Sequence, residues 1–513
     1  MLVTEQKPIN FTQSDQRISD LLDALHEVTD LEAMRALLDW DQQTGMPHGA
    51  GEVRSHQAAT LQGLIHERWT SPRLGDLLTT LEEVIDQPSF SNADRGLVRQ
   101  ARRTYDQSTK LPRQLVEEMT RAGVISHEAW VRARANNDFA SFAPHLERTV
   151  AFQREVADRF GYQEYRYDAL LDIYEPALTT REVERLFAPV RDASSSLLQR
   201  IQASGTKIDA SFLQGHFPHE QQKALAEKLL KNIGYDFSRG QIAISAHPFT
   251  NSFGSPQDVR LTVRYSNFLA SSVMAALHEG GHALYEQGIA SSLLRTPLAG
   301  GTSLGIHESQ SRLWENAIGR SEPFWRGQYH LVQEAFPQHF QHVNVQGFAQ
   351  ALNAVEAGLI RVEADEVTYN LHIIIRFELE KALINGEISV ESLPRLWNEK
   401  YRSYLGVEPD SDSNGVLQDV HWTSGFGYFP TYTLGNLYGA QIYHTLRQQL
   451  PDLDQRLAGG ETAFILDWLT SHIYTFGSIY QPAELMVHAT NEEANPDYLV
   501  RYLTDKFTKL YDL

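Results

Sequence analysis

The sequence of 513 residues contains no cysteine. This absence excludes a disulfide framework, a thiol nucleophile and thiolate ligands, so a metal ion would be held by histidine, aspartate or glutamate. No apolar run approaches the roughly 20 residues that a membrane helix needs. Residues 1–7 also lack the basic-then-apolar pattern of a secretory signal. These absences together predict a soluble, cytoplasmic protein with no membrane partner.

Basic residues are in the minority, because 45 Lys and Arg stand against 65 Asp and Glu, for a formal net charge of −20. Nucleic acid binding depends on a basic surface that displaces counterions from phosphates. Nucleic acid is therefore not expected as a partner. Hydrophobic and charged fractions of 42% and 21% are ordinary for a globular chain and exclude disordered and fibrous classes.

Low-complexity segments, charged linkers and solenoid repeats are also missing. Apolar residues instead recur at helical spacing through most of the chain, which predicts helices over 16–39, 113–160, 181–203, 220–232, 345–385, 433–449 and 461–476. Asn385-Gly386 provides a glycine cap for the helix at 345–385, and 204–218 and 406–416 are predicted surface loops. We expect a mostly α protein with one large helical domain over 1–513, which can form two lobes around a groove.

One region departs from the helical pattern. Residues 241–245 and 259–265 alternate apolar and polar positions and are separated by turn-forming residues, which is typical of strand–loop–strand. This predicted β element lies directly before a helix expected at about 266–287, which contains the most specific motif in the chain.

That motif is His278-Glu279-Gly280-Gly281-His282, an H-E-x-x-H. On a helix, the two histidines share one face roughly 6 Å apart, close enough to bind one Zn²⁺. Glu279 would then take a proton from a water that the metal acidifies. The alternatives are a chance match, with odds of about one in twenty among 20 histidines, or two hydrogen-bonded histidines at the edge of a core.

We expect the third ligand in the next predicted helix. Catalytic zinc sites of the His₂Glu type take their third protein ligand from such a helix and leave one position for water. Glu308 lies near the start of that helix, after a glycine-containing loop. An acid in a first helical turn is also favourable without any metal. His307 and Glu315 are weaker candidates, and either could act by supporting a ligand instead.

Six elements occur in an order that resembles the thermostable, Taq-type metallocarboxypeptidases. They are His247-Pro248-Phe249, Asp258 to Thr262 (D-x-R-x-T), His278 to His282, His307-Glu308-Ser309-Gln310, Ile360 to Asp365 (I-R-x-x-A-D) and Gly415 to Trp422 (G-x-x-Q-D-x-H-W). The resemblance implies a mostly helical fold with a deep groove, a small β element beside the metal, and a homodimer. It also implies a His₂Glu site of His278, His282 and Glu308, and release of single C-terminal residues from peptides, with broad specificity and poor activity on C-terminal proline. Zn²⁺ is the default metal, with Co²⁺ or Mn²⁺ as substitutes.

A carboxypeptidase must bind a terminal carboxylate, and the arginine fork suits this task. The resemblance assigns it to Arg361, although an arginine within a long predicted helix is more often solvated or ion-paired; Arg260 and Arg264 compete for the role. His247 and Arg260 inherit a weaker assignment, in which they close the far end of the groove. Both could instead only stabilise a hairpin.

Residues 421–432 are rich in donors and aromatic rings, and zinc peptidases need a donor for the developing oxyanion. His421, Tyr428 and Tyr432 are the candidates, with either tyrosine as the donor; a packed aromatic loop is the alternative. Asp365 and Asp419 could orient ligand histidines.

Two other functions remain open: a zinc oligopeptidase or dipeptidyl-releasing enzyme on a similar fold, and a non-catalytic peptide-binding scaffold with a structural metal. The lack of cysteine argues against the scaffold, because structural zinc sites often use it.

Overall fold

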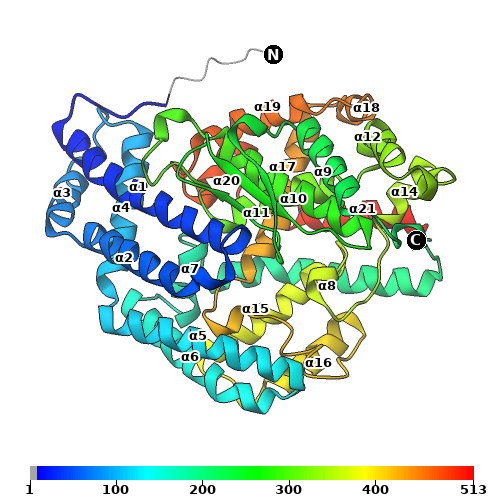
Figure 1. Ribbon diagram of the computed structural model, residues 1–513, viewed down its shortest axis with the longest axis horizontal. Coiled ribbons are helices and arrows are strands. Elements are labelled where there is room, and N and C mark those ends of the chain that lie inside the picture. Colours follow the sequence, from blue (N-terminus) through cyan, green and yellow to red (C-terminus); the bar gives the residue numbers. More distant parts are fainter. Residues whose placement is uncertain (1–8) are drawn as a thin grey trace.

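The computed structural model describes residues 9–513, and in this range the chain is mostly helical (Figure 1). The N-terminal part consists of α1 (Gln16–Thr44), α2 (Gly51–Trp69), α3 (Pro72–Glu82) and α4 (Asn92–Lys110). Asp15 caps α1 by accepting a hydrogen bond from the Arg17 backbone N–H. The helix predicted at 16–39 is thereby confirmed and extends one further turn.

The segment predicted as one helix at 113–160 is two helices, α5 (Arg113–Asn136) and α6 (Phe139–Phe160), which pack against each other. Asn137 adopts the left-handed conformation with φ of 55° and ends α5. Asp138 then starts α6 by accepting from the Ser141 backbone N–H at 3.2 Å. The periodicity continues through this turn, which is why the spacing alone missed the break.

The predicted helix at 345–385 is also wrong in its middle. The chain forms α14 (Val345–Ala351), an irregular segment with a 3₁₀ turn at Arg361–Glu363, and α15 (Tyr369–Asn385). The Asp365 carboxylate accepts from the backbone N–H groups of Val367 and Thr368 at 2.9 and 3.1 Å, a local bond that competes with helix. Arg361 therefore lies on a connecting turn, whereas Gly386, with φ of 82°, ends α15 as expected.

The remaining helices include those predicted at 181–203, 220–232, about 266–287 and 433–449, the helix expected around Glu308, and the range predicted at 461–476, which ends at His472 and continues as a 3₁₀ turn. They also include helices that were not predicted from the sequence. In chain order, the remaining helices are α7 (Arg166–Tyr174), α8 (Thr180–Ser204), α9 (His219–Ile233), α10 (Leu269–Gly288), α11 (Leu304–Arg312), α12 (Glu322–Ala335), α13 (Pro337–Phe340), α16 (Leu393–Leu405), α17 (Pro430–Gln449), α18 (Leu453–Ala458), α19 (Ala463–His472), α20 (Pro482–Thr490) and α21 (Asp497–Tyr511). A π-helical turn, η5 (Leu313–Ile318), continues α11. Among the described residues, no helix is long and apolar enough to span a membrane.

The β element is a three-stranded sheet in the order β1 (Ile242–Ile244), β3 (Val259–Val263), β2 (Thr250–Ser252). Strands β1 and β3 match the prediction but are parallel neighbours, while β2 pairs with β3 in an antiparallel hairpin. The sequence analysis missed β2, because Thr-Asn-Ser shows no apolar alternation. The buried strand β3 packs on α10 and sets β2 beside it.

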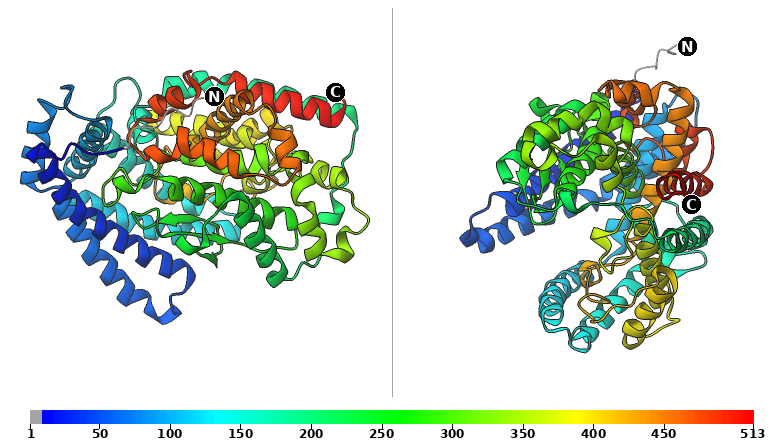
Figure 2. Two further views of the ribbon diagram at one scale, coloured as in Figure 1. Left: turned by 90° about the horizontal axis from the view of Figure 1, so that it is seen from above. Right: turned by 90° about the vertical axis from the view of Figure 1, so that its right-hand side faces the viewer.

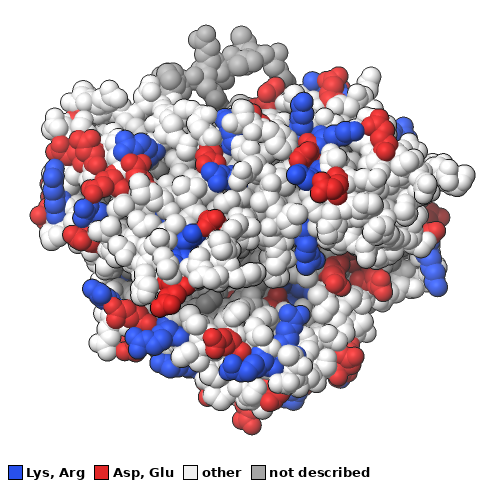
Figure 3. Space-filling view, viewed as in Figure 1, with Lys and Arg blue, Asp and Glu red and all other residues white. Residues whose placement is uncertain are grey.

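Two buried apolar clusters support this arrangement. The main one joins the helices from α5 to α21, and a smaller one joins α1–α4 to Ile289, Leu293, Leu298 and Ile479. Helices α10, α11 and α17 lie at the centre of the molecule, with α5, α6 and α16 below them (Figures 1 and 2). The space-filling view is hollowed between these upper and lower parts, and acidic and basic side chains are interspersed around the hollow (Figure 3). In this view the hollow lies below α10 and α11 and above α5 and α6.

Candidate metal centre and substrate groove

Helix α10 presents His278, Glu279 and His282 on one side. On its other sides, two glycines allow neighbouring elements to approach. A Cβ added at Gly281 would lie 2.6 Å from both the Gln310 carbonyl oxygen and the Ser311 Cα of α11. One added at Gly280 would meet Leu230 and Ile233 of α9. The glycines of the motif thus place the backbone of α11 directly against the histidine-bearing helix.

Helix α11 delivers Glu308 to the same point. Glu308 is 6% exposed, and its Oε1 accepts from Arg312 Nε at 2.7 Å. Its Oε2 lies 3.6 Å from His278 Nε2 and 3.5 Å from His282 Nε2. Candidate ligand atoms of the three side chains all lie within 4.8 Å of one another. Two imidazole nitrogens and one carboxylate oxygen form a donor set that suits a divalent transition metal.

Each histidine has a different partner behind it. His278 Nδ1 contacts Glu315 Oε2 at 2.9 Å, and His282 Nδ1 contacts His307 Nδ1 at 2.5 Å. These bonds leave both Nε2 atoms facing Glu308. Asp365 and Asp419 do not perform this task, contrary to one expectation, because Asp365 caps backbone groups and Asp419 binds arginines.

The electrostatics favour metal-binding protonation states for Glu308 and His282. For His278, burial lowers the pKa, but the nearby Glu308 and Glu315 raise it overall. Burial by itself would raise the pKa of Glu308, but Arg312 and the two histidines lower it overall. Burial lowers the pKa of His282 to about 3. An ionised carboxylate and a neutral imidazole are the forms that coordinate a metal.

Glu279 is held by the sheet. The Thr250 hydroxyl on β2 is 2.7 Å from Glu279 Oε2 and 3.0 Å from the Glu279 carbonyl oxygen. Burial raises the pKa of Glu279, while His278 and Thr250 act in the opposite direction. The carboxylate lies beside the histidines with Oε2 engaged, which leaves Oε1 to exchange a proton.

Arg361 lies in a buried cluster with Asp419 and Arg376. Arg361 donates to Asp419 Oδ1 from Nε at 3.0 Å and Nη2 at 2.8 Å, and Arg376 binds Oδ2 at 2.5 Å. The Nη1 group of Arg361 donates to the Tyr369 hydroxyl at 3.3 Å. Two guanidinium groups against one carboxylate leave an excess positive charge in a site where Arg361 is 6% exposed.

His421, Tyr428 and Tyr432 gather beside this cluster. Tyr432 Oη lies 3.5 Å from His421 Nε2, and the Arg361 guanidinium lies 5.1 Å from the Tyr432 ring centroid. The charge of Glu308 acts on both tyrosines, so they lie on the metal side. Burial lowers the pKa of His421 to about 4, with Arg361, Arg376 and His247 adding to the effect. His421 is therefore neutral at physiological pH.

His247 and Arg260 belong to the segment around β2. His247 is exposed on the loop before β2, near enough for its charge to act on His421. Arg260 is bound by Asp258 through two contacts of 2.7 Å and lies 4.7 Å from the Phe253 ring centroid. Arg264 is exposed beyond the end of β3. The paired Arg260 therefore has less freedom to bind a ligand than the sequence implied.

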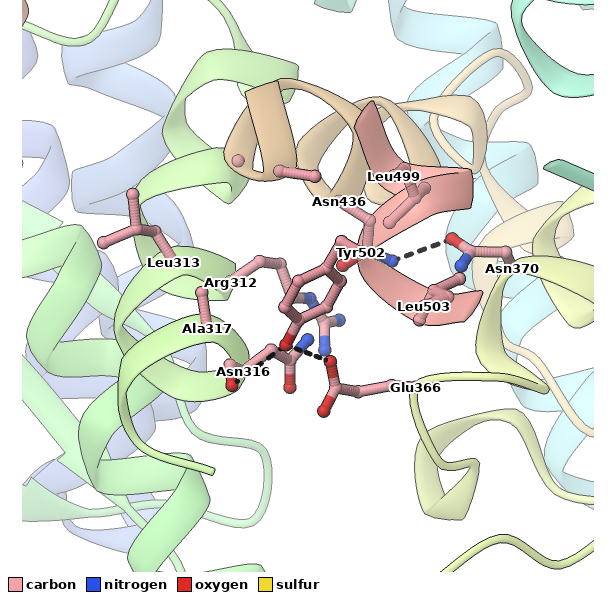
Figure 4. A pocket seen from close by; sticks show the side chains of 12 residues that line it. Arg312, Leu313, Asn316, Ala317, Glu366, Asn370, Asn436, Leu499, Tyr502 and Leu503 are labelled. Atoms are coloured by element: carbon pink, nitrogen blue, oxygen red, sulfur yellow. Dashed lines mark hydrogen bonds between the residues drawn. The ribbon is translucent and has the colours of Figure 1, made fainter. Parts of the chain in front are cut away.

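A small cavity lies beside Arg312, which lines it together with Glu366 and Tyr502 (Figure 4). Its volume of about 20 Å³ admits roughly one water molecule. Glu366 accepts from Tyr502 at 2.9 Å and pairs with Lys506 of α21. Arg312, which binds Glu308, is one of the residues that line this cavity, and the cavity is too small for a peptide.

Sequence reasoning missed Thr250, Glu286, Arg312 and Arg376. Glu286 accepts from His307 Nε2 at 2.8 Å. Its position four residues after His282 and seven after Glu279, on the same helical face, was a usable signal. The other three come from separate elements, and nothing in their local sequence indicates the contact.

An H-E-x-x-H helix with a third carboxylate from the next helix is characteristic of metal-dependent peptidases. The model of the carboxypeptidase Taq (M32) metallopeptidase family matches residues 20–507. The chain is 40% identical to carboxypeptidase 1 of Bacillus subtilis and 42% identical to thermostable carboxypeptidase 1 of Thermus thermophilus, in each case over 96% of this chain and 98% of the relative. It is also similar to the crystal structure of the M32 carboxypeptidase from Deinococcus radiodurans, with a TM-score of 0.93 and 36% identity over 97% of this chain and 100% of that one.

The chain therefore belongs to the carboxypeptidase Taq (M32) metallopeptidase family. It is a metallocarboxypeptidase, and the family implies a divalent metal.

Proposed function

We propose that this metallocarboxypeptidase is a zinc enzyme that removes single C-terminal residues from peptides. Its side-chain tolerance is broad, and it acts poorly on C-terminal proline, whose nitrogen carries no hydrogen in a peptide bond. His278, His282 and Glu308 hold the metal, for which Co²⁺ is a substitute. When bound, the metal supplies Lewis acidity toward the scissile carbonyl and the attacking water.

Glu279 is the general base in this proposal. Its Oε1 accepts the proton of the attacking water and passes it to the leaving amine, while Thr250 fixes Oε2. His421, Tyr428 and Tyr432 supply the donors for the oxyanion. The rings of Tyr428 and Tyr432 lie together, with centroids 5.4 Å apart, and either hydroxyl can be the donor.

The observation that supports carboxypeptidase action most directly is the excess positive charge of Arg361 and Arg376 over Asp419. A substrate carboxylate entering beside Arg361 would neutralise this charge inside a buried site, where unpaired charges are costly. We assign the carboxylate to Arg361 Nη1. His247 and Arg260 are assigned to the closed end of the groove.

The test compares a free-acid peptide with its C-terminal amide, using wild type and Glu279→Gln after zinc loading is verified. We expect release of one residue from the free acid alone, and its loss in the variant. Equal cleavage of the amide would favour the zinc oligopeptidase and contradict the role of Arg361. Metal binding without any hydrolysis would favour the peptide-binding scaffold.

The remaining proposals concern the whole protein. A homodimer, a cytoplasmic location and a single domain over 1–513 stay predictions, as does the absence of nucleic acid partners. Sedimentation velocity at several protein concentrations tests the first, since a dimer has twice the 58.1 kDa mass of the chain.

A further inference from the structure

Strand β2 contacts two acidic residues of α10 with the same face. Thr250 and Ser252 are two positions apart, so both side chains point to one side of the strand. Glu279 and Glu286 are seven positions apart and share one side of the helix. Thr250 binds Glu279 at 2.7 Å, and Ser252 Oγ donates to Glu286 Oε2 at 2.7 Å. The proposed function uses Glu279 but gives Glu286 no role.

Glu286 is buried and accepts from three donors. Besides Ser252, these are the Gly301 backbone N–H at 3.1 Å and His307 Nε2 at 2.8 Å, both at Oε1. His307 in turn lies between Glu286 and His282, with its Nδ1 2.5 Å from His282 Nδ1. A continuous chain of hydrogen bonds thus runs from β2 to the proposed ligand His282.

The donor inventory fixes the direction of this chain. When His282 Nε2 binds the proposed metal, that nitrogen carries no hydrogen, so the ring hydrogen is on Nδ1 and is donated to His307 Nδ1. His307 then carries its own hydrogen on Nε2 and donates it to Glu286. Each ring is therefore held in one tautomer and one orientation.

We propose that Glu286 and His307 are positioning residues that hold His282 for the metal, and that Ser252 anchors them to the sheet. This inference rests on the metal site assigned under the proposed function. At His278 the supporting carboxylate contacts the ligand directly, because Glu315 Oε2 lies 2.9 Å from His278 Nδ1. Side chains that hydrogen-bond a metal ligand typically raise the metal affinity 10- to 100-fold. Because the His307 ring lies between His282 and Glu286, and Glu286 is bound by Ser252, the orientation of His282 depends on β2.

The test measures the Zn²⁺ dissociation constant and off-rate by chelator competition on the full chain. His307→Phe keeps a ring but removes both nitrogens, and we expect affinity to fall 10- to 100-fold. His307→Asn restores an oxygen that can accept from His282 and should recover part of the loss. Glu286→Gln and Ser252→Ala should weaken binding less, by a few fold to about 10-fold.

Two variants provide matched controls. Glu380→Gln makes the same exchange at another buried glutamate, which binds Tyr167, Trp422 and the Gly427 N–H and no proposed ligand. Thr250→Ala removes a hydroxyl from the same strand but touches Glu279. We expect both to keep wild-type zinc affinity, with Thr250→Ala lowering kcat.

The outcomes separate this inference from the proposed function. If wild type binds no zinc at this site, the proposed function fails. If wild type binds tightly and His307→Phe, His307→Asn and Glu286→Gln bind equally well, the positioning role is wrong. If His307→Phe does not fold, as judged by circular dichroism, Glu286→Gln and His307→Asn decide the question in the same way.

Discussion

At the scale of single residues, the role proposed for Arg361 requires a side chain that is already paired to bind the substrate carboxylate as well. Its Nε and Nη2 are bound to Asp419, and Nη1 faces Tyr369. We predict that Arg361→Lys lowers kcat/KM on free-acid peptides by about 10- to 100-fold, mainly through KM, because a charge-assisted bond of ~1.5–3 kcal/mol is lost. Steady-state kinetics on a free-acid peptide measure this.

Arg402→Lys is the matched control, since Glu408 already holds that exposed side chain, which lies outside the proposed site. It should leave KM for the free-acid peptide unchanged. A loss in Arg361→Lys that falls on kcat with KM unchanged would instead show that Arg361 only supports the groove.

The residues closest to the metal were predictable because their geometry is local: four positions along a helix place His278 and His282 together, with Glu279 beside them. The assignment of Glu308 needed the resemblance, since from the sequence alone it could be a favourable acid in a first helical turn, with His307 and Glu315 as weaker candidates. The Arg361–Asp419–Arg376 cluster could not be predicted, because its members come from a 3₁₀ turn, a loop and α15. Only tertiary packing joins them.

At the scale of elements, the fit between α10 and α11 depends on Gly281. We predict that Gly281→Ala destabilises the protein by ~1–3 kcal/mol, because the added methyl group overlaps the α11 backbone. Zinc affinity should fall as well, since Glu308 moves with α11. Thermal unfolding and metal titration check both effects.

Gly63→Ala is the comparison, at an exposed position of α2 where an added Cβ meets nothing within 4 Å. It should be neutral or stabilise by up to ~1 kcal/mol, since alanine favours helix over glycine. Equal destabilisation by both changes would remove the packing argument.

The start of α11 depends on a buried carboxylate. Glu175 accepts from the Gly305 N–H at 2.9 Å and from Tyr438 at 3.2 Å. Burial raises its pKa to about 7, with these donors and Ser303 opposing the shift. The folded pKa lies above the unfolded value near 4.5, so the stability that this group contributes is present below pH 4.5 and lost as the pH rises through about 7.

We therefore predict that Glu175→Gln becomes more favourable relative to wild type between pH 5 and pH 8, by up to about 3 kcal/mol. Denaturant unfolding at several pH values measures the difference. Glu83→Gln, at an exposed position after α3, should follow the wild-type curve. A Glu175→Gln difference that stays constant with pH would show that this carboxyl is already ionised at pH 5.

Element boundaries show where helical periodicity stops being informative. The break between α5 and α6 is made by the left-handed backbone of Asn137 and by the Asp138 carboxylate, which accepts from the Ser141 N–H. The break before α15 is made by the Asp365 carboxylate, and β2 is made by pairing with β3. At the two breaks the apolar pattern continues, and at β2 no apolar pattern exists. These boundaries are set by hydrogen bonds, which the spacing of apolar residues does not indicate.

At the scale of the whole molecule, the metal site couples two helices that only the folded chain brings together. A metal that binds the folded state alone stabilises it by about 2.7 kcal/mol at a concentration 100-fold above its dissociation constant. We predict that chelation lowers the thermal midpoint of wild type and that added Zn²⁺ restores it.

Glu308→Gln, which keeps the shape of the side chain but loses its charge, should show little or no such shift. A shift of equal size in Glu308→Gln would place the stabilising metal elsewhere, whereas no shift in wild type would mean that packing between α10 and α11 determines the stability of this region without the metal.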